Sequence, residues 1–292
     1  MNTLEKISHN DETNYKRYLK RMTESLKFSS KGLIPGLVKE RKSILDVGCG
    51  SGVLLKAIED INPTAKLTGI DLNIDAIKEL KLNSDYNVYH MNFFDVEDTF
   101  DTVLFSSILH EISSYDEDIN KRFTEIPIKE AFEKTKDILT DRGVIVLRDG
   151  LLSDKKHKDN KVIVSFKKPQ DEYWLYRFKE DFRGFDKLDI DTSIKEIDAN
   201  RNIVSEGFLK EFLCTYTWGE SSFPREVQER FGILTEEEWI RLLIDTGFEI
   251  EQIIKSQEEY EKYLSPKVNL TYTDMKRFIY PDMSILIRAR KR

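Results

Sequence analysis

Three glycines stand within five positions in the stretch SILDVGCGSG, residues 43–52. The chain has only 13 glycines in 292 residues. Ordering a glycine costs backbone entropy, so the cluster indicates a sharp turn or a ligand that approaches the backbone closely. Gly48, Gly50 and Gly52 follow an apolar run, and Asp71 ends the next one. A carboxylate placed there can accept hydrogen bonds from both hydroxyls of a ribose, which predicts a nucleoside-containing ligand.

Along the first half of the chain, apolar runs typical of strands alternate with stretches typical of helices, and these elements must position the glycine turn and Asp71. Strands that alternate with helices predict a parallel sheet with helices on both faces. Ligands of such sheets bind beyond the carboxyl ends of the strands, where the glycine turn and Asp71 lie. The expected strands are 43–47, 65–72, 86–91, 100–109 and 143–150, and the expected helices are 13–28, 53–61, 74–82 and 126–139.

The alternation stops after Gly150 and returns at Thr235. Thr235 and Glu238 have the spacing of a capping box at the start of a helix, and Gly247 marks its end before another strand. The last expected strand is 283–291. We therefore expect an N-terminal helical cap at 1–40, a ligand-binding core made of 41–152 and 233–292, and an inserted, mostly helical lid at 153–232.

Composition narrows the class of protein. The net charge of −7 and the pI near 5.4 argue against broad binding to duplex nucleic acid, which needs a basic face. Two cysteines make neither a disulfide framework nor a metal cluster, which favours a reduced compartment. No apolar run is long enough to cross a bilayer, and the polar N-terminus is not a secretory signal. These features favour a cytoplasmic protein without a membrane partner.

Four motifs in register carry a resemblance to a known superfamily. LDVGCGSG, IDLN, MNFFD (91–95) and FDTVLFSSILHEI (100–112) resemble the first four motifs of class I S-adenosylmethionine-dependent methyltransferases. The resemblance covers about residues 40–150. It implies a Rossmann-like three-layer sandwich whose seven-stranded sheet is mostly parallel with an antiparallel last strand. A dehydrogenase is disfavoured, because position 53 is Val and the third glycine of G-x-G-x-x-G is therefore missing.

The resemblance also implies a cofactor, S-adenosylmethionine, and the residues that bind it. Asp71 is expected at the ribose, Asp46 near the amino-acid part, and Asn92 with Phe93 at the adenine. Structural alternatives remain: Asp46 as a partner of turn amides, Asp71 as a helix cap, and Phe93 as a core residue. The expected cofactor-binding residues are Asp46, Gly48, Cys49, Gly50, Gly52, Asp71, Leu72, Asn92, Phe93 and Ser106.

The expected catalytic residues are His110 and Glu111, just past the fourth strand, where the superfamily places side chains that face the acceptor. Histidine is the side chain best suited to proton transfer near neutral pH, so His110 is a candidate general base. The alternative is that His110 only lines the pocket. We expect no metal site, because no clear set of ligands stands out.

Acceptor recognition is expected in the lid, which is rich in aromatic residues. Most of them are expected to form a small core of their own, and a few to face the cleft. Five residues are predicted to bind the acceptor: Trp174, Tyr176, Arg177, Tyr216 and Trp218.

The sequence therefore predicts methyl transfer to an O or N atom, with a small molecule as the favoured acceptor and a monomer or homodimer as the assembly. The first alternative is an enzyme that modifies RNA or protein, using the lysine-rich stretch 153–168. The second alternative is a protein that binds the cofactor without catalysis.

Overall fold

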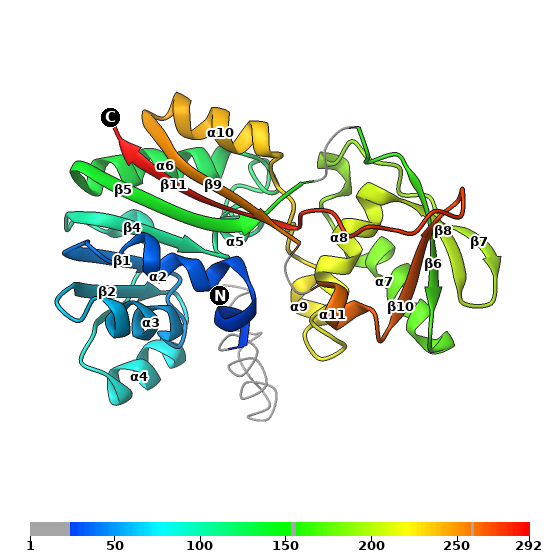
Figure 1. The fold of residues 1–292 in the computed structure, drawn as a ribbon, viewed down its shortest axis with the longest axis horizontal. Helices are drawn as coiled ribbons and strands as arrows, with labels where there is room; N and C mark the ends of the chain where they lie inside the picture. The colour runs from blue at the N-terminus through cyan, green and yellow to red at the C-terminus, as the bar shows by residue number, and fades with distance from the viewer. Residues whose placement is uncertain (1–23, 153–155, 258–259) are drawn as a thin grey trace.

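The computed structural model describes residues 24–152, 156–257 and 260–292. It has two lobes that lie side by side (Figure 1). The larger lobe is built on a seven-stranded sheet and the smaller on a four-stranded sheet. Among the described residues, no helix combines the length and the apolar character that crossing a membrane requires.

The seven strands follow the order β3-β2-β1-β4-β5-β11-β9. The first five pair in parallel, whereas β11 is antiparallel to both of its neighbours. This confirms the predicted sheet and its antiparallel last strand. The strands are β1 (Ser43–Val47), β2 (Lys66–Asp71), β3 (Asn87–His90), β4 (Phe100–Ser106), β5 (Leu139–Gly150), β9 (Phe248–Ser256) and β11 (Ser284–Lys291).

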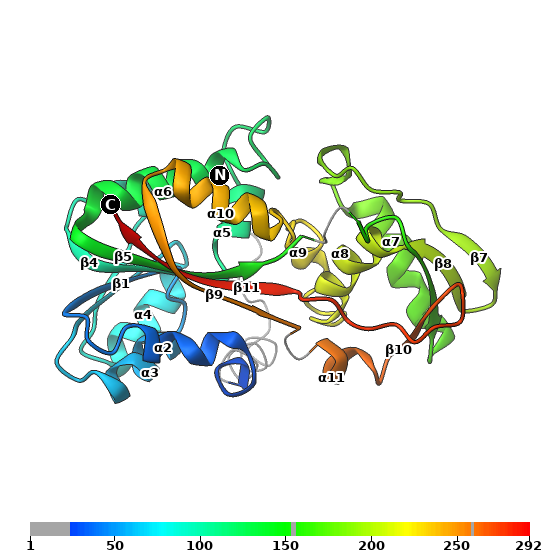
Figure 2. The same cartoon turned by 45° about the horizontal axis from the view of Figure 1, so that its top comes forward.

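Helices cover both faces of this sheet (Figure 2). Successive side chains of a strand point to opposite faces. Along β5, Val144 and Val146 pack toward one helical layer, and Ile145 and Leu147 pack toward the other. The result is the predicted three-layer sandwich. One layer holds α2 (Ile34–Leu37), α3 (Val53–Ile61) and α4 (Ile74–Asn83), and the other holds α5 (Leu109–Ser114), α6 (Ile126–Ile138) and α10 (Glu236–Asp245).

The ends of the predicted elements are set by local chemistry. The capping box of Thr235 and Glu238 is present, with both reciprocal hydrogen bonds. Gly247 follows α10 with a φ of 93°, a conformation that favours glycine. The predicted helix at 13–28 lies mostly outside the described residues, and residues 24–28 are helical.

The inserted region contains a sheet that the sequence analysis did not predict. Its antiparallel strands follow the order β10-β6-β8-β7. The strand β10 and the helix α11 come from the chain after residue 257, which we had assigned to the core. We call residues 156–232 and 260–282 the second lobe. Its elements are β6 (Lys161–Phe166), α7 (Glu172–Asp181), β7 (Lys195–Asp198), β8 (Arg201–Ser205), α8 (Glu206–Tyr216), α9 (Phe223–Glu226), α11 (Tyr260–Leu264) and β10 (Val268–Tyr272).

The second lobe has its own aromatic core. Phe178 lies fully buried at its centre, with the rings of Phe182, Phe208 and Phe212 within 5.8 Å of it, centroid to centroid. Where the chain passes between the lobes, its crossing segments are tied to one another: Leu151 N donates to Met283 O, and Leu152 N donates to Leu234 O. The aromatic residues of the insertion therefore mostly stabilise this lobe, as expected.

Candidate active site

The glycine turn joins β1 to α3, and its three glycines all have positive φ, at 71°, 50° and 74°. A Cβ atom on Gly48 would lie 2.8 Å from the side chain of Ile108, and one on Gly52 would lie 2.6 Å from that of Leu80. A Cβ atom on Gly50 would meet no atom within 4 Å. Packing and conformation explain the outer two glycines, whereas the space beside Gly50 is open to a ligand.

Asp71 ties the end of β2 to this turn. Its Oδ2 accepts a hydrogen bond from Gly50 N at 2.8 Å, and its Oδ1 accepts one from Asn73 N at 2.7 Å. Burial raises the pKa of Asp71, and these backbone donors oppose that shift. The cap of α4 is Asn73, whose side chain accepts from the N–H groups of Asp75 and Ala76. Asp71 therefore does not cap the helix, which leaves its carboxylate at the strand end beside Gly50.

Asp46 and Cys49 are buried beneath the turn. Burial raises the pKa of Asp46 to about 7, although the nearby charge of Lys31 lowers it. Lys31 is itself only 6% exposed. The Cys49 sulfur lies 2.7 Å from where a Cβ on Gly69 would stand, and burial raises the pKa of its thiol. Cys49 therefore fills space in the turn as a neutral thiol.

Asn92 and Phe93, the two residues expected at the adenine, both have structural contacts. Asn92 caps a short 3-10 helix by accepting from Phe94 N at 3.0 Å. Phe93 is only 5% exposed, and its ring meets Phe105 edge to face at 5.2 Å, so it belongs to the core. Phe93 is thus not available to stack on a base. Phe94, which the sequence analysis passed over, is 40% exposed, and Leu72 is 57% exposed.

These residues fit S-adenosylmethionine. The open space at Gly50 adjoins an acid that two backbone donors orient. At the end of β4, the buried hydroxyl of Ser106 has no hydrogen-bond partner among the described residues. Buried polar groups are usually paired, so an unpaired one at a strand end indicates a ligand there.

His110 stands at the start of α5, one strand away from the glycine turn. Its Nδ1 lies 2.7 Å from Asp149 Oδ1, at the end of β5. The other oxygen of Asp149 accepts from Leu109 N at 2.8 Å, and from His110 N. Asp149 therefore fixes both the first turn of α5 and the orientation of the imidazole ring.

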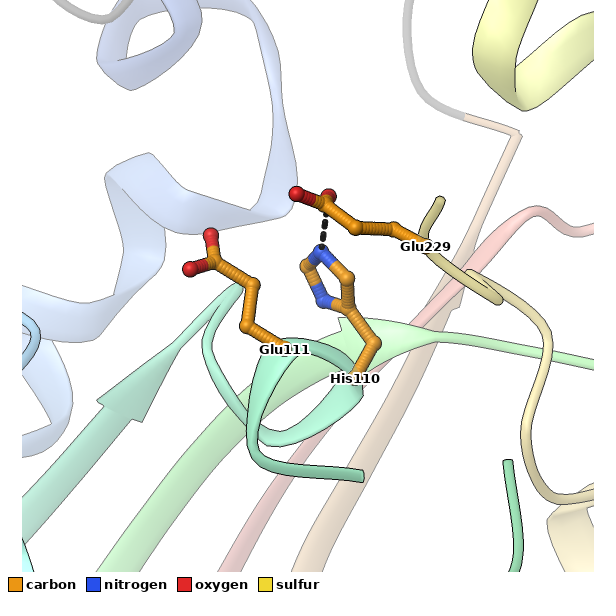
Figure 3. Close-up of side chains that lie close together, drawn as sticks. All are labelled: His110, Glu111 and Glu229. Carbon is orange, nitrogen blue, oxygen red and sulfur yellow. Dashed lines mark ion pairs between the residues drawn. The ribbon is translucent and has the colours of Figure 1, made fainter. Parts of the chain in front are cut away.

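Two glutamates flank the other side of this ring (Figure 3). His110 Nε2 lies 3.5 Å from Glu229 Oε2, while Glu229 Oε1 accepts from the Tyr115 hydroxyl at 2.9 Å. Glu111 comes from the same helix turn as His110. The ligand atoms of His110, Glu111 and Glu229 lie within 4.8 Å of one another, which makes this trio a geometric candidate for a metal site that the sequence analysis did not expect.

Burial and charge shift the pKa values of this cluster. Burial alone would lower the pKa of His110, but Asp149 and Glu229 outweigh it and raise the pKa well above its ordinary value. Burial likewise opposes the shift of Asp149, whose pKa His110 holds below its ordinary value. Burial, followed by the charge of Glu229, raises the pKa of Glu111 to about 8. The imidazole is therefore strongly basic in a buried setting.

A cavity of about 140 Å³ opens onto these side chains, at the junction of the two lobes. The core contributes Lys31, Ser107 and Arg148 besides His110, Glu111 and Asp149. The residues of the glycine turn and Asp71 are not part of its wall. The cavity is thus separate from the nucleoside end of the cofactor site. The second lobe and its junction contribute Thr217, Trp218, Arg225, Glu226, Glu229, Phe231, Tyr260 and Tyr263.

Of the five residues predicted to bind the acceptor, Trp218 lines this cavity and the other four do not. Trp174 packs on Phe223, and Tyr216 stacks on Phe212, within the second lobe. The Tyr176 hydroxyl donates to Asn202, and Arg177 pairs with Asp181. Trp174 and Tyr216 therefore pack within the second lobe, and Tyr176 and Arg177 make polar contacts on it, so that none of these four residues lines the cavity.

The sequence analysis missed Asp149, Glu229 and Arg225. Asp149 lies near the end of the fifth strand in the run VLRDG, so its place at a carboxyl strand end was the signal that could have found it. Glu229 and Arg225 lie after α8 in a segment without periodicity, and no sequence pattern marked them.

Two lysines in the described part of the lysine-rich stretch are paired with acids. Lys158 forms an ion pair with Asp189, and Lys161 forms one with Asp191. These contacts join the start of the second lobe to the loop before β7. Charges paired in this way offer little to a phosphate backbone.

A family model described as "Methyltransferase domain" matches residues 14–253. The chain is 30% identical over 106 residues to "Ribosomal protein L11 methyltransferase" of Aquifex aeolicus (strain VF5), a match that covers 35% of this chain and 43% of that protein. It is 50% identical over 46 residues to "Ribosomal RNA small subunit methyltransferase C" of Buchnera aphidicola subsp. Baizongia pistaciae (strain Bp), which covers 16% and 14%. The chain thus spans less than half of either curated relative.

Among solved structures, the pyocyanin biosynthetic protein PhzM is similar to this chain with a TM-score of 0.53 at 15% identity. The match covers 100% of this chain and 62% of that one. At this identity the likeness supports the fold alone, and it agrees with the sheet order described above.

Proposed function

We propose a reaction for this chain, which belongs to the methyltransferase-domain family and uses S-adenosylmethionine. The chain methylates an O or N atom of a small molecule, and His110 is the general base. One observation carries the proposal. The ring of His110 is held through Nδ1 by Asp149, while its Nε2 side faces a small cavity at the junction of the lobes.

When bound, S-adenosylmethionine supplies a methyl group that its sulfonium already activates. The chain's own residues must then position the acceptor and exclude water. Asp71 and the turn at Gly50 hold the nucleoside end, and Asp46 with Lys31 lies toward the amino-acid end. His110 removes a proton from the attacking atom through Nε2, and Asp149 stabilises the imidazolium that forms.

The size and walls of the cavity favour a small acceptor. Its volume of about 140 Å³ is close to that of an engineered cavity that holds one benzene molecule, roughly 150 Å³. Trp218, Phe231 and Tyr260 supply aromatic surface, as in many small-molecule pockets.

An RNA or protein acceptor is the second candidate, because the two curated relatives carry names of enzymes that act on ribosomal RNA and a ribosomal protein. Against it stand the net charge of −7 and the pairing of Lys158 and Lys161 with aspartates. Binding of a short RNA that weakens steeply between 50 and 200 mM salt would favour this candidate.

Calorimetry of the purified chain with S-adenosylmethionine, S-adenosylhomocysteine and NAD tests the cofactor site first. We expect both sulfur ligands to bind and NAD not to bind. An assay of S-adenosylhomocysteine formed from S-adenosylmethionine, with small amines and hydroxyl compounds as acceptors, then tests methyl transfer. Turnover with ribosomal RNA and none with small molecules would overturn the small-molecule proposal.

A further inference from the structure

Three carboxylates gather around the free side of the His110 ring. Glu226 is 1% exposed, and Glu229 is 3% exposed. Both line the cavity, as does the half-buried Glu111. Burying a carboxylate is costly unless donors or cations compensate it. The hydrogen-bond donors and cations around each carboxylate therefore indicate which kind of ligand suits the cavity.

Within the part of the chain that the structure describes, this compensation is incomplete. Both Nε and Nη2 of Arg225 donate to the same oxygen of Glu226, Oε1. Among the described residues, nothing donates to Glu226 Oε2 or to either oxygen of the Glu111 side chain. Glu229 is bound by Tyr115 and faces His110. Two carboxylates on one cavity wall thus keep acceptor oxygens without donors.

The cations at the cavity have their own assignments. Arg225 is taken by Glu226, and the Arg148 guanidinium donates to the Ser107 hydroxyl. The charge of Lys31 acts on Asp46, toward the cofactor site. Burial followed by crowding with Glu229 raises the pKa of Glu226 to about 7, although Arg225 and His110 oppose this shift.

Aromatic rings line the same cavity as these acids. Trp218, Tyr260 and Tyr263 line the same cavity, and the ring of Phe231 lies 4.9 Å from that of His110, centroid to centroid. Aromatic faces attract organic cations, and carboxylates supply the hydrogen-bond acceptors that an ammonium group needs.

We propose that the acceptor is a small protonated amine, held by Glu111 and Glu226 against the aromatic wall and methylated on nitrogen. This inference rests on the proposed function and names its substrate class. The amine supplies hydrogen-bond donors to the carboxylate oxygens that receive none from the described residues. A carboxylate or phosphate substrate would meet like charge on this wall.

The proton and electron transfers balance with groups that the chain, the amine and S-adenosylmethionine supply. An ammonium group gives one proton to Nε2 of the neutral form of His110, and the free amine forms with a lone pair. That lone pair forms the new N–C bond while the C–S bond of the sulfonium breaks and its electrons pass to sulfur. The product is a protonated methylamine, and the proton on His110 leaves to water.

The test uses the full chain loaded with S-adenosylhomocysteine and three probes of one shape: benzylamine, benzyl alcohol and benzoate. Calorimetry at neutral pH is expected to give benzylamine at least tenfold tighter binding than the other two. Glu111→Gln is expected to remove most of this preference, because glutamine keeps the size of the side chain but cannot ionise to pair with the ammonium group. The exposed Glu220→Gln is the matched control and should keep the preference.

Normal affinity for S-adenosylhomocysteine shows that a variant is folded. The same measurement on the unaltered chain distinguishes failure of the proposed function from failure of the amine proposal. No binding of this ligand by the unaltered chain would mean that the proposed function fails. Normal binding with no preference for benzylamine would overturn the amine class alone. Tight binding of Mn²⁺ without amine, lost in Glu111→Gln, would instead assign the cluster to a metal ion and overturn the inference. Glu226→Gln repeats the test on the second carboxylate.

Discussion

Asp149 holds the ring of His110 and the helix that carries it with one carboxylate. Oδ1 lies 2.7 Å from His110 Nδ1, and Oδ2 lies 2.8 Å from Leu109 N. The end of β5 thereby fixes the first turn of α5 and the direction of Nε2. Since β5 also carries Arg148 into the cavity wall, the strand links the sheet directly to the proposed acceptor site.

Asp149→Asn should lower the pKa of His110, because the amide keeps an acceptor for Leu109 N but loses the negative charge. A protonated imidazole cannot act as a base, so activity rises with pH through the pKa of His110. The acid limb of the pH profile of kcat/KM should therefore move to lower pH by about one unit or more. An unmoved limb would mean that Asp149 is only a helix cap.

His110→Ala should reduce kcat by roughly 100-fold or more and leave the affinity for S-adenosylmethionine unchanged. Quenched assays of methyl transfer give kcat, and calorimetry gives the affinity for S-adenosylmethionine. His157→Ala is the control, because His157 is exposed on the second lobe. A large rise in the acceptor KM with little change in kcat would show that His110 lines the pocket without acting as a base.

Asp71→Ala should weaken the binding of S-adenosylmethionine at least about tenfold, since the variant loses the ribose contact and leaves Gly50 N and Asn73 N without their acceptor. Calorimetry measures the change. Asp98→Ala, at an exposed position after β3, should bind like the unaltered chain. Equal affinities of the two variants would contradict the ribose assignment.

The sequence predicted the larger lobe well because its signals are local. The glycine turn, the apolar runs and the capping box at Thr235 each act within a few residues. The five parallel strands then follow from alternation with helices. Asp71 and His110 could be placed because both stand at carboxyl ends of strands, where the topology itself gathers functional groups.

The second lobe escaped prediction because its contacts are distant in sequence. The strand β10 pairs with β6 across about one hundred residues, and no local pattern reveals such a partner. Glu229 reaches His110 from a stretch without periodicity. The sequence could not show that Trp174 and Tyr216 pack inside the second lobe and do not line the cavity, because an aromatic side chain in a pocket and one in a core look alike in sequence.

Glu111→Gln should stabilise the protein more at alkaline than at acidic pH. Burial and the charge of Glu229 raise the pKa of Glu111 to about 8, from 4.5 in an unfolded chain. Between these values the folded state holds a proton that the unfolded state releases, so this group's contribution to the free energy of unfolding falls as pH rises. Glutamine removes that dependence.

Thermal unfolding at pH 5 and pH 8 measures this effect. The gain in Tm of Glu111→Gln over the unaltered chain should be several degrees larger at pH 8, given about 2–4 °C for each kcal/mol in a protein of this size. Glu117→Gln, at an exposed position in the loop after α5, should show the same Tm difference at both pH values. A gain for Glu111→Gln that does not depend on pH would mean that its carboxyl group titrates normally and that the cavity wall already carries enough positive charge. Loss of stability at pH 8 would show that the ionised carboxylate has a partner in the folded protein, which would also count against an amine as the missing cation.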